Sequence, residues 1–138
     1  MAGPAQRIGG DVIQNQNRYT HRELRQLLYL YPYLSLGKPP HNDSAVETLW
    51  QNLFGLREGW QTKAARKRGE VQRALEWLNG ESQWYCYTVR AAYIVGLSNR
   101  DIASYIARID GRSIHHDTVN EWRKRGFELL LEHLNGER

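Results

Sequence analysis

The densest group of potential metal ligands and proton carriers in the sequence is the run His115-His116-Asp117. Two histidines that share a metal ion on a helix are typically four residues apart, because that spacing puts both rings on one face. Adjacent histidines in a helix point about 100° apart, so we expect no metal site here. We expect the run to begin a helix, where Asp117 complements the helix dipole and His115 and His116 face phosphates or base edges.

No other spacing predicts catalytic chemistry. The sequence contains no glycine-rich phosphate loop, no Cys, His and Asp set typical of nucleophilic catalysis, and no pair of carboxylates in an apolar setting. Its single cysteine, Cys86, lies between Tyr85 and Tyr87 and has no partner for a disulfide or a zinc site. We therefore expect no enzymatic activity and no cofactor. A buried thiol in a reducing, cytoplasmic compartment is the expected role of Cys86.

A second chemical pattern lies near the C-terminus, where donors and acceptors recur at helical spacing. Val119, Trp122, Gly126 and Leu130 follow one another at i, i+3, i+7 and i+11, which predicts one apolar helix face. Trp122 is expected to be a core anchor, with stacking on a base as the alternative. The opposite face carries groups that pair with base edges, since Asn suits adenine, Lys suits guanine and Glu accepts from cytosine. The expected base-reading residues are His116, Asp117, Asn120, Glu121 and Lys124.

A shorter apolar pattern precedes this helix. Gly96 lacks a Cβ and can end a helix in the left-handed conformation, while Ser98 is a typical N-cap with Asp101 three residues on, as in a capping box. The next helix is expected to have one apolar face, formed by Ile102, Ala103, Ile106 and Ile109. A break at residues 110–113 follows. Two short helices, the second rich in donors and acceptors, are what a helix-turn-helix needs to read a major groove.

Two runs in this region resemble a known family: Gly96–Ala103 (GLSNRDIA) and Thr118–Arg125 (TVNEWRKR). They are similar to the fourth region of sigma factors and to the C-terminal modules of phage late-gene transcription regulators, of the RinA/ArpU type or the lambdoid antitermination Q type. The resemblance covers Trp84 to Leu134. Where the family has a tight turn, Arg108 to Ser113 looks like an insertion of about six residues. A short helix ending in Tyr31-Pro32 also resembles the RinA type.

Basic side chains supply most of the affinity of a DNA-binding protein and make it depend on salt. Around the two C-terminal helices, the expected phosphate contacts are Ser98, Arg100, Arg112, His115, Arg123 and Arg125. A separate basic run is expected to form an accessory patch for DNA backbone or RNA polymerase, although such runs are more often a solvated helix face. It consists of Lys63, Arg66, Lys67 and Arg68, four of the 19 Lys and Arg residues in a chain of net charge +4.

The whole chain of 138 residues reads as all-α with about six helices, because no segment alternates with period two. We expect a flexible arm at 1–17, a helical region at 18–80 and a DNA-binding module at 81–138. Capping boxes are expected to start helices at Thr20 and Ser44, Pro32 to end the first helix, and Asn79-Gly80 to end a later one. No membrane span or signal peptide is expected.

The resemblance implies a sequence-specific regulator of phage late genes that binds double-stranded DNA in the host cytoplasm. It would act as an activator or an antiterminator, with the N-terminal half facing RNA polymerase or a second copy of the chain. Two other classes remain open. A phage small terminase subunit also joins a helix-turn-helix to helices that oligomerise, usually with the DNA-reading unit near the N-terminus. A helical interaction module that binds no DNA is the other.

Overall fold

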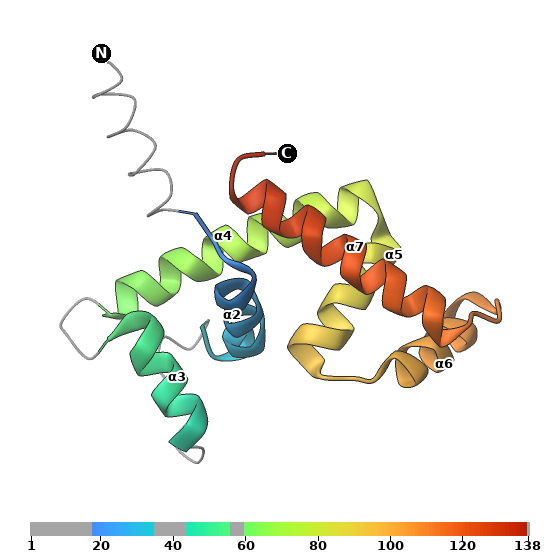
Figure 1. Cartoon of the computed structure of the whole chain (residues 1–138), viewed down its shortest axis with the longest axis horizontal. Coiled ribbons are helices and arrows are strands. Elements are labelled where there is room, and N and C mark those ends of the chain that lie inside the picture. Colours follow the sequence, from blue (N-terminus) through green and yellow to red (C-terminus); the bar gives the residue numbers. More distant parts are fainter. Residues whose placement is uncertain (1–17, 35–43, 56–59, 138) are drawn as a thin grey trace.

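The computed structural model describes residues 18–34, 44–55 and 60–137, with side chains from residue 63 onward in the last range. All regular structure in these residues is helical, as expected for an all-α chain with about six helices. The elements are α2 (His21–Leu34), α3 (Ser44–Phe54), α4 (Trp60–Glu81), α5 (Gln83–Val89), the π-helical segment η1 (Arg90–Val95), α6 (Asn99–Asp110) and α7 (His116–Leu134) (Figure 1). The expected arm at 1–17 lies outside the described residues.

The expected N-cap Thr20 and a further N-cap, Ser82, hold the starts of their helices. The Thr20 hydroxyl accepts a hydrogen bond from the Glu23 amide at 3.0 Å, and the Ser82 hydroxyl accepts one from the Tyr85 amide at 3.2 Å. Each bond satisfies one of the amide groups that a helix start leaves without an intrahelical partner. Helix α3 begins at Ser44, as the sequence pattern predicted.

Two predicted helix ends are wrong, for tertiary reasons. Helix α2 continues through Pro32 to Leu34. A proline so near the end removes only one of the last backbone hydrogen bonds, and Leu34 is buried in the core. Helix α4 continues through Gly80 to Glu81. Gly80 does not take the left-handed conformation, and the Ser82 amide still bonds to the Leu78 carbonyl at 2.8 Å.

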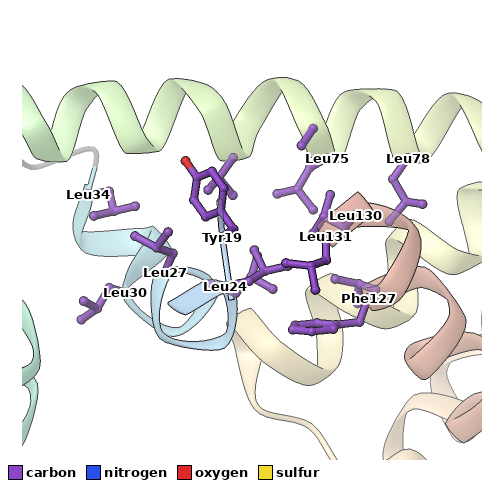
Figure 2. Packing of buried hydrophobic residues seen from close by; sticks show 14 of the residues in the cluster. Tyr19, Leu24, Leu27, Leu30, Leu34, Leu75, Leu78, Phe127, Leu130 and Leu131 are labelled. Carbon is purple, nitrogen blue, oxygen red and sulfur yellow. The ribbon is translucent and has the colours of Figure 1, made fainter. Parts of the chain in front are cut away.

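A large hydrophobic cluster joins both ends of the chain. It takes leucines from α2 and α4, aromatic residues from α3, and the C-terminal half of α7. Figure 2 shows the side chains of α2 and α7 lying beneath α4, around Leu75 and Leu78. The segment before α2 is tied to the end of α7, because Tyr19 and Asn135 exchange two hydrogen bonds of 2.6 and 3.0 Å. The cluster therefore draws on residues from both sides of position 80.

A small hydrophobic cluster lies between η1, α6 and the N-terminal half of α7. Its buried members are Ala91, Ile102, Ala103, Ile106 and Val119, and Trp84 and Trp122 pack against it. The prediction that Ile109 belongs to this apolar face is wrong, since 64% of Ile109 is exposed. The cluster ends at Ile106, one turn earlier, so the last turn of α6 extends beyond it.

Helix α7 links the two clusters. Val119 lies in the small cluster, whereas Leu130 lies in the large one. Between them, Gly126 lies where α7 crosses α5, and a Cβ there would be 2.8 Å from Val89 Cγ2 and 3.1 Å from the Tyr85 carbonyl oxygen. The expected apolar face of α7 is therefore confirmed, and its glycine is required by close approach of the two helices.

Candidate nucleic-acid interface

The chain enters α6 through a sharply defined connection. Gly96 has a φ of 89° and ends η1, as the sequence predicted for the preceding helix. The amides of Gly96 and Leu97 both bond to the Ala91 carbonyl, at 3.0 and 2.9 Å. Ser98 then caps α6 by accepting from the Asp101 amide at 3.1 Å. These contacts fix the direction in which α6 leaves the end of η1.

The connection from α6 to α7 is longer than a tight turn, and part of the expected insertion is helical. Helix α6 includes Arg108 and ends at Asp110. Gly111 follows it with a φ of 70°, and its N–H donates a hydrogen bond to the Ala107 carbonyl. The next residues lead to His115, which is the N-cap of α7. The extra residues in the run 108–113 thus extend α6 by most of a turn and lengthen the loop after it.

The outer side of α7 carries three of the expected base-reading residues. Asp117, Glu121 and Lys124 are exposed, and their spacing of four and then three residues places them on one helix face. His116 is half-buried beside them. A shallow hollow on this side, next to α5, is lined by Tyr85, Glu121, Trp122, Lys124, Arg125 and Glu128.

Asn120 lies on a different side of α7 and faces α6. Its side-chain oxygen accepts a hydrogen bond from Asn99 Nδ2 at 3.2 Å and a second one from Arg123. The predicted base contact by Asn120 would require these bonds to break. The partner, Asn99, is the first residue of α6, and no periodic pattern in the sequence indicated it.

Arg123 is also engaged within the protein. Its Nη1 donates to the Tyr93 hydroxyl at 2.8 Å, and the guanidinium carbon lies 5.5 Å from the centre of the Tyr93 ring. Its Nε is buried and makes no hydrogen bond to any residue that the structure describes. Asn99, Asn120, Arg123 and Tyr93 therefore form one polar clasp that ties η1, α6 and α7 together. This arrangement leaves the Arg123 side chain poorly placed for the expected phosphate contact.

The remaining expected phosphate contacts are spread over the start of α6, the loop after it and α7. Arg100 and Arg125 are exposed. Arg112 is exposed and pairs with Asp110 at 2.9 Å. His115 is largely exposed, but its Nδ1 accepts a hydrogen bond from the Asp117 amide at 3.1 Å. The Ser98 hydroxyl oxygen is likewise engaged, because it accepts the capping hydrogen bond from the Asp101 amide.

The expected accessory patch on α4 is divided. Lys63 and Arg66 are exposed, whereas Lys67 lies over the Tyr19 ring at 4.3 Å and pairs with Glu70 at 3.7 Å. Arg68 is half-buried. The first turns of α4 lie at the opposite end of the long axis from the start of α7 (Figure 1). The patch and the outer side of α7 are therefore separate surfaces.

The net positive charge does not lie in the same part of the chain as the expected DNA-contacting residues. Residues 81–138 carry eight Lys and Arg residues and eight Asp and Glu residues, so the net charge of +4 resides in residues 1–80. The outer side of α7 itself mixes Asp117 and Glu121 with Lys124. Attraction to a polyanion is therefore weaker at this module than the arginine run alone suggests.

The His115-His116-Asp117 run has a geometry that the sequence interpretation did not anticipate. His115 has extended backbone dihedrals of −81° and 146° and precedes the helix, so the expectation that both rings diverge from one helix is wrong. The ring centres of His115 and His116 are 4.2 Å apart. One ligand atom from each of the three residues lies within 4.8 Å of the other two. The two rings lie close together because His115 is the N-cap of α7 and only His116 is within the helix.

Comparison of the chain with models of known protein families, with curated proteins and with solved structures finds no match. None of the helices in the described part of the chain combines the length and apolar composition that a membrane span requires.

Proposed function

We propose that the chain is a sequence-specific regulator of transcription that binds double-stranded DNA through α6 and α7, as in the phage late-gene regulators its sequence resembles. The observation that carries the proposal is the outer side of α7. There, Asp117, Glu121 and Lys124 are exposed on one face, while Val119 is buried on the other. A recognition helix needs this division, because its apolar side must hold it to the module while its polar side reads base edges.

The side-chain contacts refine the assignment of roles. Glu121 and Lys124 are the principal base-reading residues, assisted by His116 and Asp117. Arg100, Arg112 and Arg125 supply phosphate contacts, because each is exposed. The clasp residues Asn120 and Arg123 orient α7 through their bonds to Asn99 and Tyr93.

RNA polymerase is the proposed partner of the N-terminal part of the chain. Lys63 and Arg66 are exposed on the first turns of α4, at the opposite end of the long axis from the start of α7. A partner bound at these residues leaves the outer side of α7 free for DNA. Replacing both with Ala should reduce transcription activity and leave the selected DNA motif unchanged.

A helical interaction module that binds no DNA is the second candidate, and the charge balance of residues 81–138 favours it. Selection of sequences from a random pool of duplex DNA separates the two functions. The proposed regulator returns a motif, and Lys124→Ala relaxes one base pair of it, at a cost of about 1–3 kcal/mol on the preferred site. Arg125→Ala instead weakens all sequences about equally and lowers the salt dependence.

A matched control for these variants is Arg22→Ala, which removes an exposed charge from α2 and should change neither the motif nor the salt dependence. Failure to enrich any motif would exclude the regulator and leave the interaction module. A packaging-type site together with a large ring in light scattering would indicate a small terminase subunit.

A further inference from the structure

We propose that His115, His116 and Asp117 bind one divalent transition metal ion such as Zn²⁺ at the start of α7. Metal binding is independent of the proposed DNA function, and only its consequence for DNA rests on that function. Two imidazoles and a carboxylate are the donor set that Zn²⁺ and its neighbours prefer in proteins. The three residues are consecutive, so the site needs no contribution from a distant element.

Each histidine has a ring nitrogen close to one carboxylate oxygen of Asp117. His116 Nδ1 is 3.2 Å from Asp117 Oδ1, and His115 Nδ1 is 3.4 Å from Asp117 Oδ2. Bond lengths of about 2.0 Å in a tetrahedral site put neighbouring donor atoms about 3.3 Å apart. Each histidine is therefore about one such edge from one carboxylate oxygen, and one ligand atom from each of the three residues lies within 4.8 Å of the other two.

Two acceptor atoms of the cluster also lie close together. His115 Nδ1 accepts the Asp117 amide at 3.1 Å, so this nitrogen carries a lone pair and no proton. The Asp117 carboxylate oxygen 3.4 Å away also carries only lone pairs when ionised. Two acceptors without a shared hydrogen repel one another, and a positive ion between them reverses that interaction.

The metal competes with the helix cap for the His115 lone pair. Binding through Nδ1 exchanges one capping hydrogen bond for a metal bond. The site is also exposed, with 65% of the His115 side chain and 77% of the Asp117 side chain accessible. Three protein donors on an exposed surface leave a coordination position for water or another ligand.

The open position gives the site a consequence for the proposed function. Without metal, Asp117 places a negative charge at the start of α7, where it opposes an approaching phosphate. With a divalent ion the same cluster becomes positive and its open position accepts a phosphate oxygen. Metal should therefore strengthen DNA binding through the start of α7.

Metal binding is tested on the full chain without DNA, by titration with Co²⁺ followed by visible absorption and by calorimetry with Zn²⁺. We expect saturation at one equivalent and the absorption of a low-symmetry Co²⁺ site. His115→Asn, His116→Ala and Asp117→Asn should each weaken metal binding about tenfold or more, because loss of a residue that merely supports a metal ligand already has an effect of about this size. His115→Asn retains an N-cap residue, and circular dichroism checks that each variant is folded.

Two matched controls use histidines outside the cluster. His21 Nε2 lies 2.5 Å from a carboxylate oxygen of Glu128, so this pair offers only two potential metal ligands. The His133 ring stacks on the Trp77 ring, with the ring centres 4.1 Å apart. His21→Ala and His133→Ala should leave the Co²⁺ titration unchanged. No saturable binding, or equal binding by the double variant His115→Asn and His116→Ala, would overturn the proposed site.

The consequence for DNA is tested by measuring DNA binding in the presence of Zn²⁺ and again in the presence of a chelator. Stronger DNA binding in Zn²⁺ for the unmodified chain, but not for Asp117→Asn, supports the consequence. One bound metal ion without any selected DNA motif supports the metal site and overturns the DNA function. Failure of one proposal is thereby distinguished from failure of the other.

Discussion

The two halves of α7 lie in very different surroundings. The C-terminal half packs into the large cluster, which holds twenty buried residues. Four of them belong to α7 itself, and the others come from α2, α3, α4, α5 and Tyr19. The N-terminal half covers the small cluster, which holds five. The same continuous helix is therefore strongly anchored at one end and lightly anchored at the other.

This difference explains why polar contacts gather at the lightly anchored end. A buried aliphatic side chain contributes about 1.5–3 kcal/mol, so five small or medium residues provide limited stabilisation to α6. The clasp adds hydrogen bonds from Asn99 to Asn120 and from Arg123 to Tyr93. Stacking of Trp84 on Trp122, with ring centres 6.4 Å apart, adds a third contact. The position of this end of α7 relative to α5, η1 and α6 thus depends on a few specific side chains.

The largest expected effect is that of Val119→Asp, which places an unpaired carboxylate at a fully buried position beside Ile102 and Ile106. Such a change should cost about 4 kcal/mol or more. If the two clusters differ as described, hydrogen exchange will show that α6 loses protection while α2 and α4 keep theirs.

The control for this variant is Val95→Asp, at a position that is 67% exposed, where the change should be within about 0.5 kcal/mol. Equal loss of protection in α2 and α4 would contradict the comparison, because both clusters would then unfold as one unit.

A smaller effect is expected where the two halves of α7 meet. Gly126→Ala places a methyl group 2.8 Å from Val89 and 3.1 Å from the Tyr85 carbonyl. Overpacking of this kind costs about 1–3 kcal/mol, and a gain of up to about 1 kcal/mol in helix propensity offsets part of it. Thermal unfolding should therefore show net destabilisation.

Gly80→Ala is the matched control, since among the described residues no side chain and no backbone of another element lies within 4 Å of a Cβ at that position in α4. Only the gain in helix propensity remains there, so this variant should be slightly more stable than the parent chain. A Gly126→Ala variant as stable as Gly80→Ala would show that α5 and α7 move apart easily.

Features set by a few neighbouring residues were predictable from the sequence. The buried face of α7 follows from the spacing of Val119 and Leu130, and the caps at Ser82 and Ser98 follow from residue type and position. The all-helical architecture follows from the same periodicities. The apolar stripe of one helix could thus be read without knowledge of its partners.

Features set by contacts between helices were not predictable. Periodicity puts Asn120 beside Val119 on the helix surface, but whether it meets DNA or Asn99 depends on how α6 crosses α7. The continuation of α2 past Pro32 depends on burial of Leu34 in the core. The approach of the two histidine rings depends on whether His115 is the cap or the first helical residue. Each outcome needs information beyond one local pattern.

The polar clasp of the lightly anchored end is tested by Arg123→Met and Tyr93→Phe. Hydrogen bonds to a charged group are worth about 1.5–3 kcal/mol, and residues in contact should show a coupling energy in a double-mutant cycle. We expect Arg123→Met to lower stability and to leave the salt dependence of DNA binding unchanged. A shallower salt dependence without loss of stability would restore Arg123 as a phosphate contact, as the sequence alone predicted.

The smallest expected effect concerns the polar edge of the strongly anchored region, where Glu70 accepts a hydrogen bond from Tyr19. Burial raises the pKa of Glu70, and the charge of Arg73 offsets part of the increase. A carboxyl group with a raised folded-state pKa binds its proton more tightly in the folded chain than in the unfolded one. Its contribution to stability is therefore present in acid and declines as the pH rises through the unfolded and then the folded pKa.

Glu70→Gln removes this ionisation and retains a side-chain oxygen that can accept from Tyr19. The variant should unfold at an equal or slightly higher temperature than the parent at pH 7, and this advantage should vanish near pH 4, around the ordinary pKa of glutamate. Glu76→Gln removes an exposed carboxylate from the same helix and corrects for the change in net charge. The opposite result is that Glu70→Gln destabilises the chain relative to the parent at pH 7 but not at pH 4. It would show that the 3.7 Å pair with Lys67 stabilises ionised Glu70 by more than burial destabilises it. In that case the edge of the large cluster would depend on a specific polar contact, as the small cluster does.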